Sequence, residues 1–136
     1  MKADWIEIKK GDMSTASVGL RATLNRKGAL AMNRFTYTKL GEPEAFHVLY
    51  DRVNNRIGLR PTRLAMRNAY RISVPHKHGK RVIGIARLMR EYAVILPETV
   101  EFPHAEIDED GILILDLRTA RVSNHAIGRQ KVNGEQ

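Results

Sequence analysis

The same succession of local sequence patterns occurs twice in this chain, and this constrains its fold more than any other feature. An extended stretch, a basic turn containing glycine, a second extended stretch, a short helical segment and a hairpin follow one another in residues 18–61 and again in residues 69–117. A pattern that repeats at this period is typical of two related structural units. We therefore expect a mainly β (α+β) chain built from two degenerate β-α-β repeats.

Each repeat ends in a hairpin whose turn residues tolerate a positive φ. The first turn contains Asn54 and Asn55, between the alternating stretches "AFHVLYD" and "RIGLR". The second contains Asp110 and Gly111, within "EIDEDGILILDL". Such residue pairs suit tight turns between antiparallel strands. Both segments are therefore expected to form β-hairpins.

The last strand of the second hairpin is apolar on both faces. Alternation puts Ile112 and Ile114 on one face, and Leu113, Leu115 and Leu117 on the other. A strand that is apolar on both sides is typically buried on both sides. We expect this strand to lie at the centre of the core or in a subunit interface.

A short stretch with helical spacing precedes each hairpin, "RFTYTKLG" in the first repeat and "ARLMREYAV" in the second. Gly41 is the expected end of the first helix. The segments outside the repeats are an N-terminal arm or strand, a linker and a mobile tail, at residues 1–17, 62–68 and 118–136.

Charge is unevenly distributed along the sequence. The net charge is +8, with eleven Lys and Arg and no acid from Arg52 to Arg90, and eight acids without any Lys or Arg from Glu91 to Asp116. The two segments could neutralise each other in the fold, or the basic segment could form a face that binds phosphate. The sequence leaves both interpretations open.

Several function classes are disfavoured by what the sequence lacks. Without cysteine there are no disulfides, thiol nucleophiles or thiolate metal ligands. No apolar run is long enough for a transmembrane helix, and "MKADWIEIKK" has no secretory-signal core, so we expect a cytoplasmic protein without membrane association. No nucleophile elbow or phosphate-binding glycine motif occurs, so we expect no enzyme and no cofactor.

His76 and His78 are two residues apart, which would put both rings on one face of a strand. Lys77, Lys80 and Arg81 surround them and repel a cation, and no acidic residue is nearby. We therefore expect no metal site.

Three short motifs of the first repeat match a known family: a turn glycine followed by alternating apolar residues, a helix ending in Leu-Gly, and a hairpin that closes on an apolar pair and proline. The matching residues are Gly28, Leu30, Met32, Leu40, Gly41, Ile57, Leu59 and Pro61. Residues 20–61 thereby resemble the swapped-hairpin DNA-binding domain of AbrB- and MazE-type transcription regulators, and the tandem order resembles the MraZ arrangement. The resemblance implies that the hairpins of both repeats interleave into one small pseudo-symmetric barrel.

The resemblance implies a transcription regulator that binds double-stranded DNA without a cofactor. The cations near the first basic turn, residues 25–28, and the second basic turn, residues 75–80, would contact phosphates. These candidates are Arg21, Arg26, Lys27 and Arg34 in the first repeat, and Lys77, Lys80 and Arg81 in the second. Either turn by itself is equally explained as a solubilising loop end, and the sequence leaves open whether the chain forms a homodimer.

Departures from the family pattern favour an alternative function. At two positions where the family carries arginine, this chain has Ala29 and Tyr37, and Asn33 stands in place of the helix-initiating proline. The alternative is a non-enzymatic protein-interaction module, an antitoxin-like or degenerate AbrB-fold protein. Its tail, from Arg118, would become ordered on an acidic protein partner.

Overall fold

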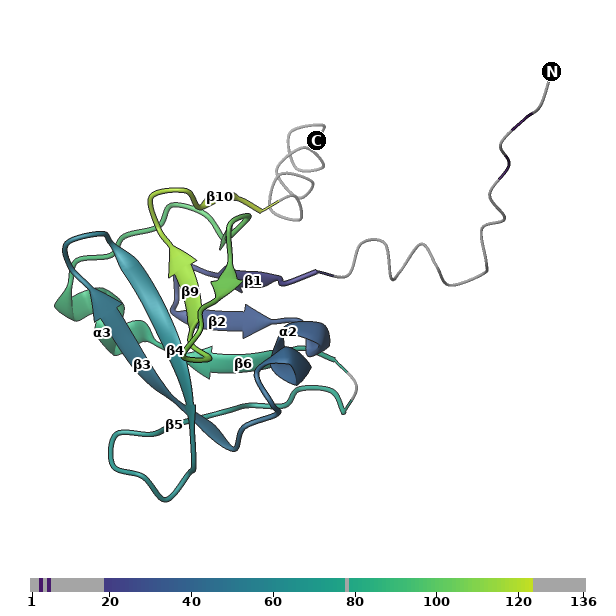
Figure 1. Cartoon of the computed structure of the whole chain (residues 1–136). Coiled ribbons are helices and arrows are strands. Elements are labelled where there is room, and N and C mark those ends of the chain that lie inside the picture. Colours follow the sequence, from purple (N-terminus) through teal and green to yellow (C-terminus); the bar gives the residue numbers. More distant parts are fainter. Residues whose placement is uncertain (1–2, 4, 6–18, 78, 124–136) are drawn as a thin grey trace.

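The computed structural model, drawn in Figure 1, describes residue 3, residue 5 and residues 19–77 and 79–123. The chain is mainly β, with two antiparallel five-stranded sheets. Sheet A has the order β10 (Arg121–Val122), β7 (Val100–Glu101), β1 (Ala22–Leu24), β2 (Ala29–Met32) and β6 (Arg81–Gly84). Sheet B has the order β5 (Tyr70–Arg71), β3 (Ala45–Asp51), β4 (Arg56–Thr62), β9 (Leu113–Asp116) and β8 (Glu106–Ile107). The helices are α2 (Arg34–Lys39) and α3 (Ala86–Glu91).

Both sheets combine strands from the two halves of the chain. In sheet A, β2 pairs with β6 so that Leu30 lies opposite Ile83. In sheet B, β4 pairs with β9 so that Leu59 lies opposite Leu113. Because each sheet is joined across the halves, residues 18–61 and 69–117 share one fold and do not form separate domains.

The strand pairings leave two open sheets where the sequence suggested a barrel. Residues 70–71 pair with β3 in sheet B, and the chain then reaches sheet A through a single bridge between Ser73 and Val82. Within the described residues no further pairing joins the sheets. The outer strands β5, β8 and β10 are each only two residues long.

The core lies between the two sheets. Sheet A contributes Leu24, Leu30 and Ile83, and sheet B contributes Phe46, Ile57, Leu59, Leu113 and Leu115; all are at most 1% exposed. Within the single chain the two faces of β9 differ, because Leu113 and Leu115 are buried whereas Ile112 and Ile114 are only half-buried. They lie on the outer face of sheet B, where Ile112 packs over Gly58.

The helices and hairpins predicted from local sequence are confirmed. The Asn33 side chain caps α2 by accepting a hydrogen bond from the Thr36 N–H (2.9 Å), and Gly41 ends that helix at a φ of 87°. The hairpin turns use positive φ at Asn55 (53°) and Gly111 (80°).

The C-terminal end of the described chain differs from the sequence expectation of a mobile tail from residue 118. Arg121 and Val122 form β10, whose Arg121 bonds Glu101 at 2.8 Å, so the first part of the expected tail belongs to sheet A. Residues 124–136 and nearly all of the expected arm, residues 1–17, lie outside the described residues. No helix in the described part of the chain is long and apolar enough to cross a membrane.

Candidate nucleic-acid interface

The outward face of the β2–β6 pair carries small side chains. Leu30, Met32 and Ile83 point into the core. The alternate positions of the two strands are the outward ones, because side chains alternate along a strand. They are Ala29, Ala31, Val82 and Gly84. Figure 1 shows β2 and β6 side by side and running in opposite directions, so the two basic turns lie at opposite ends of this pair.

At the α2 end, cations from both halves of the chain come together. The pairing of Ala22 with Met32, and of Met32 with Arg81, places Arg21 and Lys80 on either side of Asn33. Two strand spacings separate them, about 10 Å. Both side chains are exposed, as is Lys77 in the adjoining second basic turn. Arg21, Lys77 and Lys80 therefore form one cationic group.

Arg34, at the start of α2, connects this group to the second basic turn. Its guanidinium donates to the Lys77 carbonyl (3.1 Å) and to the Glu42 carboxylate (3.2 Å). Nε of Arg34 is buried and has no hydrogen-bond partner among the described residues. The Glu42 carboxylate offsets the charge of Arg34. The main role of Arg34 is therefore to position the second basic turn through the Lys77 carbonyl.

At the α3 end, the first basic turn exposes Arg26 and Lys27. The Asn25 side chain shapes the turn by accepting hydrogen bonds from the N–H groups of Lys27 (3.0 Å) and Ala29 (2.8 Å). Arg26 and Lys27 line a groove together with Arg90 of α3. These three cations form the second cationic group.

Gly28 fixes the first basic turn against α3. Its φ is 97°, and its carbonyl accepts a hydrogen bond from the Ile85 N–H at 2.8 Å. A Cβ at this position would lie 2.6 Å from both N and Cα of Ala86. Only glycine permits this approach of turn to helix, which explains the turn glycine in physical terms.

Arg81 is placed differently from the other candidate contacts, because it is only 7% exposed. Its guanidinium donates to the carbonyls of Gly79 (2.7 Å), Lys77 (3.3 Å) and His76 (3.5 Å). It also lies 4.9 Å from the centroid of the Tyr37 ring. Arg81 therefore orders the second basic turn from beneath.

The structure regroups the cations that the sequence assigned repeat by repeat. Arg21 and Arg34 join Lys77, Lys80 and Arg81 at the α2 end, while Arg26 and Lys27 remain at the α3 end. Arg90 was not among the residues predicted from the sequence, because it lies near the first basic turn only through the pairing of β2 with β6, which no local pattern specifies. Glu101, on the same face of sheet A, is held by Arg121.

Comparisons with known proteins assign no family: no protein-family model matches the chain, and no curated protein or solved structure matches it. The AbrB-type resemblance stays a prediction. The described residues contain no group of three or more His, Asp or Glu side chains that could hold a metal ion. His78 lies outside the described residues.

Proposed function

We propose that this chain binds double-stranded DNA through the outward face of sheet A, as a transcription regulator of AbrB-like type. One observation carries the proposal: exposed cations stand at both ends of the β2–β6 pair, with only small side chains between them. Phosphate contacts from such cations supply most of the affinity of a protein for duplex DNA.

The dimensions of this face suit a duplex. Five residue steps separate the row of Asn33 from the row of Gly28, which corresponds to about 17 Å along the strands. The major groove of B-DNA is about 12 Å wide. The two cationic groups can thus reach the phosphate backbones on both sides of the groove, while the small residues lie over it.

We also infer that the two halves are related as swapped-hairpin repeats. The pairs β2–β6 and β4–β9 each join equivalent antiparallel strands, as a pseudo-two-fold axis through both pairs requires. Each basic turn contacts the start of the other half's helix: Gly28 bonds Ile85, and Lys77 bonds Arg34. The reciprocal contacts support two copies of one ancestral unit.

Binding to a 20-base-pair duplex across a salt series tests the proposed function. The Lys27→Gln/Lys80→Gln variant removes one cation from each group, so the slope of log affinity against log salt should flatten by roughly 1.8 units. The control Arg52→Gln/Arg63→Gln loses the same net charge at exposed positions in the β3–β4 turn and after β4. Equal flattening in both variants, or no duplex binding at low salt, would contradict the proposal.

A further inference from the structure

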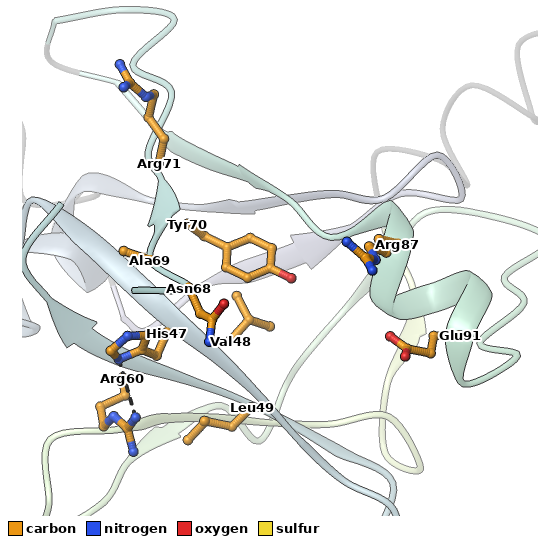
Figure 2. A pocket seen from close by; sticks show the side chains of 10 residues that line it. All are labelled: His47, Val48, Leu49, Arg60, Asn68, Ala69, Tyr70, Arg71, Arg87 and Glu91. Atoms are coloured by element: carbon orange, nitrogen blue, oxygen red, sulfur yellow. Dashed lines mark hydrogen bonds between the residues drawn. The ribbon is translucent and has the colours of Figure 1, made fainter. Parts of the chain in front are cut away.

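A groove of about 770 Å³ lies where β5 and β3 separate, with α3 on its other side (Figure 2). β3 pairs with β4 along all seven of its residues, but with β5 only at Ala45 and Phe46. Just before β5, Asn68 adopts a φ of 63°. Within the described chain, the edge of β3 that faces β5 therefore has no strand partner from His47 onward.

Specific contacts define both ends of this free edge. At one end, Arg60 donates to Nδ1 of His47 (3.3 Å), and Nε2 of His47 donates to the Arg67 carbonyl (2.9 Å). At the other end, the rings of Tyr50 and Tyr92 stack with centroids 4.6 Å apart. The free segment from His47 up to Tyr50 comprises residues 47–49, or about 10 Å.

The groove combines an apolar floor with positively charged walls. Val48 and Tyr70 contribute the floor, and Leu49 lines the groove from the other face of β3. Figure 2 shows the Tyr70 ring extending toward Arg87 of α3. Arg60 and Arg87 lie on opposite sides, and Glu91 is the acid among the lining residues. In the described part of the chain, the exposed Arg87 side chain bonds to no other side chain, so its charge is available to a ligand.

We propose that this groove binds a short extended segment of an acidic protein partner, which adds to the free edge of β3. A strand added to an open sheet edge gains main-chain hydrogen bonds, and the pockets beside the edge select its side chains. Here acidic side chains meet Arg60 and Arg87, and apolar ones pack on Val48 and Tyr70. A nucleic-acid strand carries no peptide N–H and C=O groups for the free edge.

This site is independent of the proposed DNA interface. The groove uses β3, β5 and the exposed side of α3, and it shares no cation with the groups around the two basic turns. Failure of peptide binding would therefore leave duplex binding unaffected, and the reverse also holds.

Fluorescence anisotropy with a labelled pentapeptide that alternates glutamate and valine tests the proposal. We expect saturable binding that weakens at least tenfold in Arg87→Glu. The matched control is Arg63→Glu, which makes the same change of charge at an exposed position outside the groove and should weaken binding less than twofold. Equal losses in the two variants, or no saturation up to millimolar peptide, would overturn the proposal.

A second peptide separates strand addition from charge attraction. Methylation of alternate backbone nitrogens keeps every carboxylate but removes the main-chain donors, so we expect at least a tenfold loss of affinity. Undiminished binding of the methylated peptide would overturn strand addition. Arg87→Glu that weakens duplex binding and spares the peptide would instead assign the groove to nucleic acid. Self-association of the chain that Arg87→Glu abolishes, with no peptide binding, would assign the groove to a second copy.

Discussion

The two basic turns occupy equivalent places in the chain but use their cations differently. In the first turn, Arg26 and Lys27 are both exposed, and the neutral Asn25 side chain shapes the backbone. At the second turn, Lys77 and Lys80 are exposed, while Arg81 is buried beneath the turn and bonds its carbonyls. The first turn thus offers all of its charge to a ligand, and the second commits part of its charge to its own structure.

The difference follows from turn length. Residues 25–28 close with a hydrogen bond from the Gly28 N–H to the Asn25 carbonyl at 3.1 Å, and glycine supplies the positive φ. The longer second turn brings the carbonyls of His76, Lys77 and Gly79 within reach of one side chain, that of Arg81. A guanidinium carries five N–H donors and can satisfy several carbonyls at once. The Arg81 side chain therefore acts as a structural donor and is not an exposed cation.

Replacing Arg81 should give the largest effect. Arg81→Met removes the buried guanidinium that donates to the Gly79, Lys77 and His76 carbonyls and lies over the Tyr37 ring, so it should lower the free energy of unfolding by about 2–4 kcal/mol. Arg26→Met, the same substitution in the first turn, removes an exposed side chain and should cost less than about 0.5 kcal/mol. Urea denaturation of the two variants measures the difference. Similar costs would show that the turns use their arginines alike.

Replacing the turn glycines should destabilise the first turn more than the second, the opposite of what we expect for the arginines. Gly28→Ala combines a positive φ with a clash against the α3 backbone, so we expect a loss of at least about 2 kcal/mol, or a fall in Tm of about 6 °C or more. The matched variant is Gly79→Ala, whose Cβ would approach the His76 Cβ at 3.1 Å and meet no backbone atom closer than 3.7 Å. It should cost well under half as much, and a larger cost than that of Gly28→Ala would show that the second turn is the tighter one.

Local chemistry explains what could be predicted from the sequence. Gly41, Asn55 and Gly111 indicated their turns because positive φ strongly limits residue choice. The short helices and alternating strands followed from periodicity over a few residues. These features depend on neighbours in the chain, and the structure has them where the sequence indicated.

Long-range pairing explains what could not be predicted. Arg21 and Lys80 meet only through the register of β1 with β2 and of β2 with β6, which no local pattern specifies. The same limit applies to β10, and to the outer face of β9, where apolar Ile114 remains half-exposed. Nothing in the sequence around Arg81 distinguishes a buried donor from an exposed cation. The sequence thus indicated that cations lie near both basic turns, but not how the fold groups them.

Duplex binding tests whether the two basic turns contribute equally to DNA affinity. Arg26→Gln/Lys27→Gln and Lys77→Gln/Lys80→Gln each remove two exposed cations, so each should flatten the slope of log affinity against log salt by roughly 1.8 units. Equal changes would show that the turns contribute equally despite their different construction. A changed sequence preference in the first variant alone would assign base contacts to the first turn, and an unchanged slope in either variant would identify that turn as a solvated loop.

The smallest expected effect on stability concerns a third turn, between β3 and β4. A carboxylate orders this turn, whereas the Arg81 guanidinium orders the second basic turn. The Asp51 carboxylate accepts hydrogen bonds from the Asn54 side chain (2.9 Å), from Arg56 (2.8 Å) and from the Asn54 N–H (3.1 Å). These bonds, that of the Asn54 side chain above all, hold the pKa of Asp51 well below its usual range. A carboxyl whose pKa is depressed by folding stabilises the fold above its unfolded pKa, about 3.9, and this contribution is lost as the pH falls toward the folded value. The Tm of the wild type should therefore exceed that of Asp51→Asn by a constant margin from pH 8 to pH 5, and the margin should shrink below about pH 4. A margin that stays constant down to pH 2 would show that the Asp51 carboxylate does not order its turn in the way that Arg81 orders the second basic turn.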